Sequence, residues 1–138
     1  PDFVGDNEIL VFGNDVIDSS WIREDMAILT RSSRYGYNNI YRVNLKDGSI
    51  TKPYTTALKA MKVNTDTGGR SELLKNGDVF VDETKHGRLL RLTPEKVRWE
   101  YVHRVDQGLV SLLGWVRYLQ AEQVKPILPK LKNASCDK

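Results

Sequence analysis

Apolar and polar residues alternate in short segments along this chain, and turn-forming residues separate the segments. Glu8–Phe12 is a short apolar run, and Ile40–Leu45 alternates with a period of two. Such alternation is typical of a β-strand with one buried face. Lys46–Gly48 follows, and its glycine suits the positive φ of a hairpin turn. We therefore expect residues 49–54 to return as the next strand.

The same order of strands and turns recurs in the second half of the chain. Glycine or proline marks each turn, at Gly77, Gly87 and Pro94, and these residues interrupt regular structure. The pattern predicts strands at 71–74, 79–81, 89–92 and 97–102.

The two sets of strands are similar enough to be two copies of one unit. Ile9 corresponds to Val79, Tyr41 to Leu90, and Tyr54 to Tyr101. A repeat of about 45 to 50 residues with three or four short strands is typical of a β-propeller blade. A plain antiparallel sandwich or meander is the alternative that this pattern leaves open.

These units predict an all-β fold made of antiparallel propeller blades, with about two blades, a terminal strand and a short C-terminal helix. We expect one incomplete propeller domain over residues 1–138. The first blade covers 1–55 and carries a long insertion at 16–37, and the second covers 69–105. A closing strand and a tail follow at 109–138.

Helical spacing is limited to short segments. It occurs at Trp21–Leu29 inside the insertion and at Thr56–Met61 between the blades. Residues 121–132 have helical composition, but Pro126 and Pro129 limit any helix there, because proline removes a backbone donor. Residues 109–119 are apolar and predict one more strand.

Composition adds few constraints on function. The 138 residues are 40% apolar and 28% charged, with a net charge of +3, which is ordinary for a globular domain. The basic residues are spread along the strands rather than gathered in a patch, so we expect no nucleic-acid partner. The single cysteine, Cys136, predicts no disulfide within the chain. The sequence contains no apolar run long enough to predict a membrane segment, and no segment in it has the pattern of a signal peptide.

A series of motifs, taken in order, resembles the arylsulfotransferase family. Residues 69–83 (GRSELLKNGDVFVDE) resemble that family's GRSE–x–LxNGDxFVxE segment. The GR at 87–88, the WEYVHR at 99–104 and the GWVRYL at 114–119 follow in the family's order, which has WxYVNR and GWSR–x–L. Asp2–Asn14 resembles its DF–NxIxxFNN strand.

The resemblance implies a six-bladed propeller with an active site at its central channel. It implies sulfuryl transfer from a phenolic sulfate to a phenol, with a histidine taking the sulfuryl group and no nucleotide donor. A His-Asp pair usually precedes the opening strand in that family, whereas this sequence begins at Pro1–Asp2. We therefore expect a C-terminal fragment whose open edges are covered by missing N-terminal blades or by another chain. A periplasmic or secreted parent is implied as well.

Arg70, Glu72, Glu83 and Arg34 are the residues we expect at an anion or substrate site. Arg70 follows two glycines and matches the family's GRSE, and arginine suits an oxyanion because its planar fork matches two oxygens. Glu72 could hold the guanidinium, or the two could form a structural pair between blades. Glu83 matches FVxE, and we expect it to accept structural hydrogen bonds. Arg34, like Arg31, lies in the insertion that the family places over the channel mouth.

No catalytic residue can be assigned from the sequence. Neither His86, in an expected turn, nor His103, where the family has Asn, matches the family's transferring histidine. The family's arginine after its FDNG-like segment is also out of register here, because Val16 and Ile17 follow Phe12–Asp15. We expect the chain alone to be inactive, with no metal and no cofactor.

The alternatives left open are a parent sulfotransferase acting on small phenols, a non-catalytic propeller that binds a ligand or partner, and a self-contained β-domain that assembles through its edges.

Overall fold

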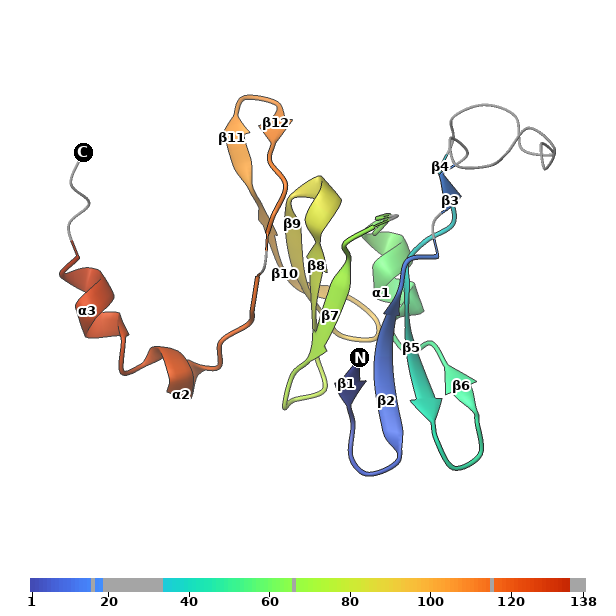
Figure 1. Cartoon of the computed structure of the whole chain (residues 1–138). Helices are drawn as coiled ribbons and strands as arrows, with labels where there is room; N and C mark the ends of the chain where they lie inside the picture. Colours follow the sequence, from blue (N-terminus) through green and yellow to red (C-terminus); the bar gives the residue numbers. More distant parts are fainter. Residues whose placement is uncertain (16, 19–33, 66, 115, 135–138) are drawn as a thin grey trace.

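The computed structural model describes residues 1–15, 17–18, 34–65, 67–114 and 116–134. The fold is mostly β, with antiparallel sheets and only short helices, as the sequence predicts (Figure 1). Within the described residues, the sheets do not close into a ring. None of the helices in these ranges is both long enough and apolar enough to cross a membrane.

The first sheet has four strands in the order β1-β2-β5-β6. They are β1 (Asp2–Phe3), β2 (Glu8–Gly13), β5 (Asn39–Asn44) and β6 (Ile50–Thr51). The central pair matches Ile9 with Val43 and Val11 with Tyr41, so the alternation seen in the sequence sets the register. β6 is shorter than the expected strand over 49–54, because Pro53 cannot donate to a neighbouring strand.

The second sheet repeats this arrangement in the order β10-β9-β8-β7. Its strands are β7 (Arg70–Leu73), β8 (Val79–Glu83), β9 (Arg88–Leu92) and β10 (Val97–Val102). All four strands predicted for this half are present. The 3₁₀ turn η3 (Thr84–His86) ends at Gly87, whose φ of 58° is left-handed. A glycine takes this conformation at little cost, which explains the turn between β8 and β9.

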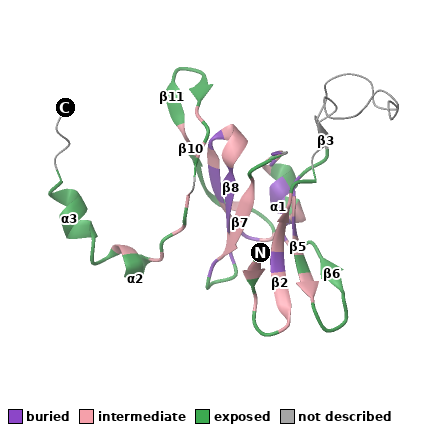
Figure 2. Cartoon of the chain, viewed as in Figure 1, coloured by how far each residue is buried: buried purple, intermediate pink, exposed green. Residues whose placement is uncertain are grey.

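The main core lies between one face of each sheet (Figure 2). Leu10 and Ile40 of the first sheet pack with Val79, Val81 and their neighbours in the second. The helix α1 (Thr55–Ala60) closes this core with its buried residues Ala57 and Leu58. Strands β1 and β7, each at one edge of its sheet, are also linked directly, because the carboxylate of Asp2 accepts a 2.9 Å hydrogen bond from the backbone N–H of Leu73.

The repeat relation inferred from the sequence holds for the central strands. Ile9 pairs with Val43 as Val79 pairs with Leu92, and Tyr41 then occupies the position of Leu90. Leu10 is therefore equivalent to Phe80, yet Leu10 packs in the shared core while Phe80 faces the opposite side of its sheet. The two sheets thus stack front to back, with non-equivalent faces in contact.

The expected equivalence of Tyr54 and Tyr101 is wrong. Tyr54 lies beyond β6 at the start of α1 and is 5% exposed, whereas Tyr101 lies within the outer strand β10 and is 42% exposed. The early end of β6 at Pro53 takes Tyr54 out of the sheet and into the interface between the sheets.

The prediction of a closing strand over 109–119 is also wrong for most of its length. Only β12 (Leu109–Val110) is a strand, and it pairs with β11 (Arg104–Asp106) in a separate ribbon. Residues 111–114 and 116–119 form no strand. Leu113, Val116 and Tyr118 instead cross the outer face of the second sheet and pack on Leu74, Phe80 and Leu89. Side-chain packing therefore holds this part of the chain, together with backbone hydrogen bonds from Ser111 to His103 and from Leu113 to Thr84.

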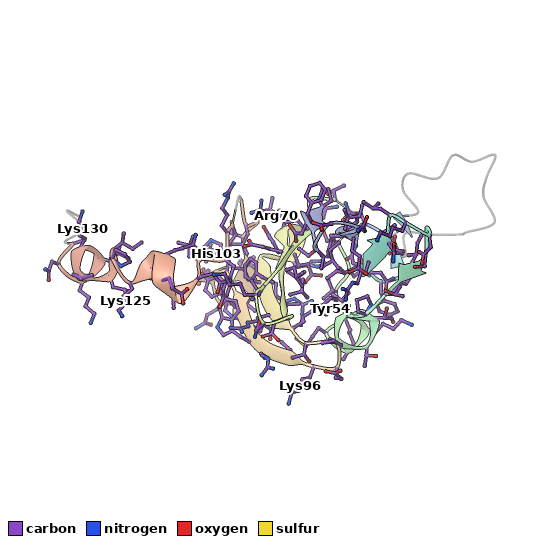
Figure 3. The ribbon with its side chains drawn as sticks, turned by 90° about the horizontal axis from the view of Figure 1, so that it is seen from below. Tyr54, Arg70, Lys96, His103, Lys125 and Lys130 are labelled. Carbon is purple, nitrogen blue, oxygen red and sulfur yellow. The ribbon has the colours of Figure 1, made fainter. Side chains whose placement is uncertain are left out.

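The C-terminal helical region forms an arm that leads away from the sheets (Figure 3). It contains α2 (Ala121–Val124) and α3 (Leu128–Lys132), with Pro126 between them. The break confirms the limit expected from the prolines. In the insertion, β3 (Ile17–Asp18) pairs with β4 (Arg34–Tyr35). The expected helical turn at 21–29 lies outside the described residues.

Candidate functional site

The alternation of side chains along β7 and β8 separates the expected site residues into two groups. Arg70 pairs with Asp82, and Glu72 pairs with Phe80. These residues face the outer side of the second sheet, where Phe80 packs on Tyr118. Glu83 follows Asp82 and therefore faces the opposite side. The fold brings Arg70 and Glu72 together and keeps Glu83 apart from them.

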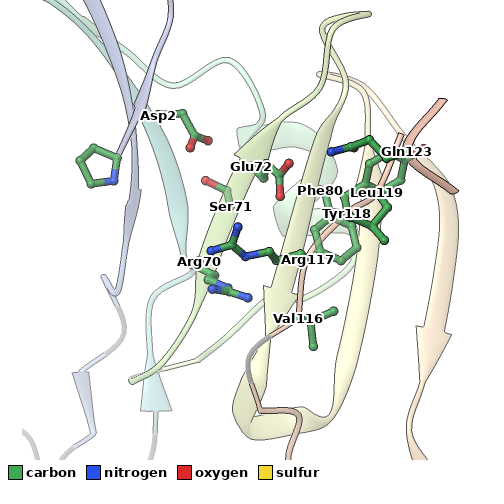
Figure 4. Close-up of a pocket in the computed structure, with 11 residues that line it drawn as sticks. Asp2, Arg70, Ser71, Glu72, Phe80, Val116, Arg117, Tyr118, Leu119 and Gln123 are labelled. Atoms are coloured by element: carbon green, nitrogen blue, oxygen red, sulfur yellow. The ribbon is translucent and has the colours of Figure 1, made fainter. Parts of the chain in front are cut away.

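A hollow of about 460 Å³ lies on this outer side, between the inner strands and the C-terminal segment (Figure 4). Arg70 and Arg117 both line it, from β7 and from the segment that crosses the sheet. Ser71 and Glu72 add polar groups, and the remaining walls include Pro1, Asp2, Phe80, Val116, Tyr118, Leu119 and Gln123. Two guanidinium groups beside aromatic rings make this hollow suited to an anion that carries an apolar group.

Arg70 is held by an ion pair with Asp82. Its Nε lies 3.5 Å from Oδ2 of Asp82, whose side chain is 2% exposed. Burial raises the pKa of Asp82, and this effect exceeds the opposing hydrogen bond from Thr84 and the charge of Arg70. Glu72 is the partner predicted from the sequence for this guanidinium, and that pairing stays a prediction. The ion pair that the structure describes comes from Asp82, on the facing strand.

The position of Arg117 depends on its neighbour Tyr118. The Tyr118 ring packs against Phe80 with centroids 5.6 Å apart, and its hydroxyl oxygen lies 3.0 Å from Nη1 of Arg91. Arg91 is fixed in turn by Asp78, with 2.7 Å between Nε and Oδ2. These contacts hold the C-terminal segment against the sheet. Because Arg117 is adjacent to Tyr118, they also place Arg117 in the lining of the hollow.

Asp78 is the buried anchor of that chain of contacts. Burial alone would raise its pKa, but hydrogen bonds from Asn76, Arg91 and Arg98 together hold the pKa below its ordinary value. Asp78 therefore stays ionised and keeps both arginines in place.

Glu83 joins three parts of the chain. Its carboxylate is fully buried and accepts hydrogen bonds from the Asn64 backbone N–H at 2.7 Å and from Arg88 Nε at 2.6 Å. His86 Nδ1 lies 2.9 Å from the same carboxylate. Arg88 also donates to the carbonyl oxygen of Met61 at 2.9 Å. Glu83 thus has the structural hydrogen-bonding role expected from the sequence, and it does not line the hollow near Arg70.

Neither histidine is among the described residues that line this hollow. His86 is not simply an exposed turn residue, because Glu83 contacts its ring. His103 lies beside Tyr101, with 3.1 Å between Nδ1 and the phenolic oxygen. Arg34 belongs to β4 on the insertion, and its side chain, like the whole of Arg31, lies outside the described residues. The described part of the chain contains no group of three His, Cys, Asp or Glu residues placed to hold a metal.

Asp82 and Arg117 are the site residues that sequence reasoning missed. Arg117 belongs to the GWVR segment, but the predicted strand gave no reason to place it beside Arg70. Asp82 stands next to Glu83, and only the register of β7 and β8 shows which of the two carboxylates faces Arg70.

Comparisons with models of known protein families, with curated proteins and with solved structures found no match.

Proposed function

We propose that this chain contributes two neighbouring blades to an arylsulfotransferase-like β-propeller, and that its Arg70–Arg117 hollow binds the sulfate group of a phenolic sulfate ester. One observation carries the proposal: two guanidinium groups from separate parts of the chain line one hollow beside Phe80 and Tyr118. The ester has the matching composition, since it joins an oxyanion to an aromatic ring.

The form of the two sheets supports the propeller. Each is a four-stranded antiparallel sheet whose strands lie side by side in chain order, and propeller blades are built in the same way. Front-to-back stacking also supports it. A contact between non-equivalent faces, when repeated with a constant rotation, generates a ring. Further blades, from the same protein or from another chain, would cover the remaining open faces.

The chemistry of the hollow supports an anionic ligand. Hydrogen bonds from arginine to an oxyanion are charge-assisted and contribute about 1.5 to 3 kcal/mol each. In the parent protein these arginines would stabilise the charge on the oxygens of the transferring sulfuryl group.

The first experiment measures binding of 4-methylphenyl sulfate to the 138-residue chain by isothermal titration calorimetry. We expect saturable binding that is weakened about tenfold or more by Arg117→Gln, as for loss of a charged hydrogen bond. Arg42→Gln is the matched control, because Arg42 is an arginine on the first sheet that pairs with Glu8 and does not line this hollow. Equal affinity in all three proteins would overturn the proposal.

A second function is favoured by the absence of a histidine from the described lining of the hollow. A propeller that binds an aryl anion without transferring the group would have the same two arginines. Release of 4-nitrophenolate from 4-nitrophenyl sulfate, in the presence of an acceptor phenol, separates the two functions. If the parent protein that contains this chain binds 4-nitrophenyl sulfate but releases no 4-nitrophenolate, the result supports the non-catalytic binding module.

A further inference from the structure

A row of aromatic rings lies on the edge strand of the second sheet. Trp99 and Tyr101 belong to β10 and are 47% and 42% exposed. Residues two apart on a strand share a face, and the planes of these two rings differ by only 12°, with centroids 6.4 Å apart. The ring of His103 follows, with its centroid 6.3 Å from that of Tyr101. This aromatic row therefore leaves stacking surface open to solvent along the strand.

A hollow of about 290 Å³ lies at the Trp99 end of the aromatic row. Trp99 lines it together with Arg91, Arg98 and Tyr118. Consecutive residues of a regular strand face opposite sides, but the register of β10 shifts between Val97 and Trp99. Such a bulge re-aims a side chain, which explains how Arg98 and Trp99 line the same hollow.

The two arginines bring a surplus of positive charge to this hollow. Both pair with Asp78 through Nε, at 2.7 Å from Arg91 and 3.1 Å from Arg98, and one carboxylate balances only one of the two charges. The Arg98 side chain is 50% exposed. Among the described residues, no hydrogen-bond partner is found for the two terminal nitrogens of its guanidinium. These donors suit a carboxylate or sulfate group of a ligand.

We propose that Trp99, Tyr101 and Arg98 form a binding site for an acidic polysaccharide. The C–H bonds on the flat side of a sugar ring are weakly positive, and they pack on the negative face of an aromatic ring. Because the planes of Trp99 and Tyr101 are nearly parallel, consecutive sugar units can contact both rings in one orientation. The guanidinium of Arg98 then binds an acidic group of the polymer, which an uncharged polysaccharide lacks.

A single-stranded nucleic acid is the competing occupant, because its bases also stack on exposed aromatic rings. Such a strand carries a charge at every unit and binds in a positively charged groove that follows its backbone. The arginines that line this hollow lie at one end of the aromatic row, so the row itself offers mainly stacking surface. This distribution favours the polysaccharide. The site is independent of the proposed function, because Trp99, Tyr101 and Arg98 do not line the Arg70–Arg117 hollow.

The test measures binding of a galacturonic acid hexamer to the 138-residue chain by isothermal titration calorimetry, with cellohexaose as the uncharged hexamer. We expect the acidic hexamer to bind about tenfold or more tightly than cellohexaose, as for one charged hydrogen bond. Arg98→Gln should remove most of this difference. Trp99→Ala should weaken binding about 2- to 10-fold, the range for one aromatic contact.

Two control variants change residues of the same type outside the site. Tyr37→Ala removes an exposed aromatic ring away from the row, and Arg42→Gln removes an arginine that pairs with Glu8 on the first sheet. Both should leave the affinity for the acidic hexamer unchanged. An equal loss in the controls and in the site variants would overturn the proposal.

Three other results would also overturn it. They are equal affinity for the two hexamers, unchanged affinity in Trp99→Ala, and binding of hexauridylate without binding of the acidic hexamer, which would assign the row to nucleic acid. If Trp99→Ala does not fold, Tyr101→Ala decides, because it removes the neighbouring ring of the row. Unchanged affinity in that variant would reject the site.

Discussion

The hydroxyl of Tyr54 donates a 2.7 Å hydrogen bond to the backbone carbonyl oxygen of Gly77. Tyr54 belongs to the segment that leaves the first sheet, and Gly77 lies in the turn between β7 and β8 of the second. The bond therefore joins the two sheets beside their shared apolar core, to which Tyr54 itself belongs. Burial raises the pKa of Tyr54, so the phenol keeps its proton for this bond at neutral pH.

Tyr54→Phe tests whether the two sheets unfold as one unit. We expect the free energy of unfolding to fall by about 1 kcal/mol, the contribution of one buried hydrogen bond. Urea denaturation followed separately by circular dichroism and by tryptophan fluorescence gives the measurement. Tyr37→Phe, at an exposed position, should change little. Two separate transitions in the wild-type chain would contradict a single cooperative unit.

Replacement of the buried carboxylate in Glu83→Gln should be much more costly. The variant removes the charge of a fully buried carboxylate and leaves Arg88, whose side chain is 19% exposed, without this ionised partner, so we expect a loss of about 3 kcal/mol. Glu100→Gln is the matched control, because Glu100 also pairs with Arg88, at 3.4 Å, but its side chain is 39% exposed. An exposed pair contributes less than about 1 kcal/mol. Equal losses in the two variants, measured by urea denaturation, would rule out the central role of Glu83.

The strands could be predicted from the sequence because each is a local pattern. Short apolar runs and a glycine turn specify β8, η3 and β9 almost without reference to the rest of the chain. The segment after Gly108 could not be predicted in this way. Its apolar residues are of the same kind that form strands. They do not pair as a strand because the apolar side chains around Phe80, on one face of the second sheet, need a cover, and Leu113 and Tyr118 pack on them.

The candidate site was predictable in part for the same reason. Arg70 could be identified because it follows two glycines and because its segment resembles the GRSE motif named in the sequence analysis. Its pairing with Asp82 depends on register across two strands, and its proximity to Arg117 depends on a contact between distant segments. Both are long-range relations that periodicity does not encode.

Gly87→Ala should destabilise the turn between β8 and β9 more than an ordinary glycine substitution. Gly87 has a φ of 58°, and a Cβ there would collide with the backbone carbonyl of Ser111. Gly48 has a φ of 71° with open space around it, so Gly48→Ala should cost only about 1 kcal/mol. We expect a loss of more than about 2 kcal/mol for Gly87→Ala, because steric strain adds to the backbone cost. Similar midpoints of thermal unfolding would contradict the close contact with Ser111.

The pKa of Asp82 predicts a dependence of stability on pH that opposes that of Asp78. Burial raises the pKa of Asp82 in the folded chain above its ordinary value near 3.8, so the folded state binds this proton more tightly than the unfolded state. The contribution of Asp82 is fully present below pH 3.8 and is lost as the pH rises through the raised pKa. The free energy of unfolding of the wild type should therefore fall relative to Asp82→Asn as the pH rises from 3.8.

Asp78 provides the internal comparison, because its folded pKa lies below 3.8. Its contribution is present above that pH and is lost as the pH falls through the lowered pKa. Relative to Asp78→Asn, the wild type should gain stability as the pH rises toward 3.8. Urea denaturation of the three proteins, from acid to neutral pH, gives both differences. A difference for Asp82 that rises with pH would contradict the raised pKa, because the charge of Arg70 would then outweigh burial.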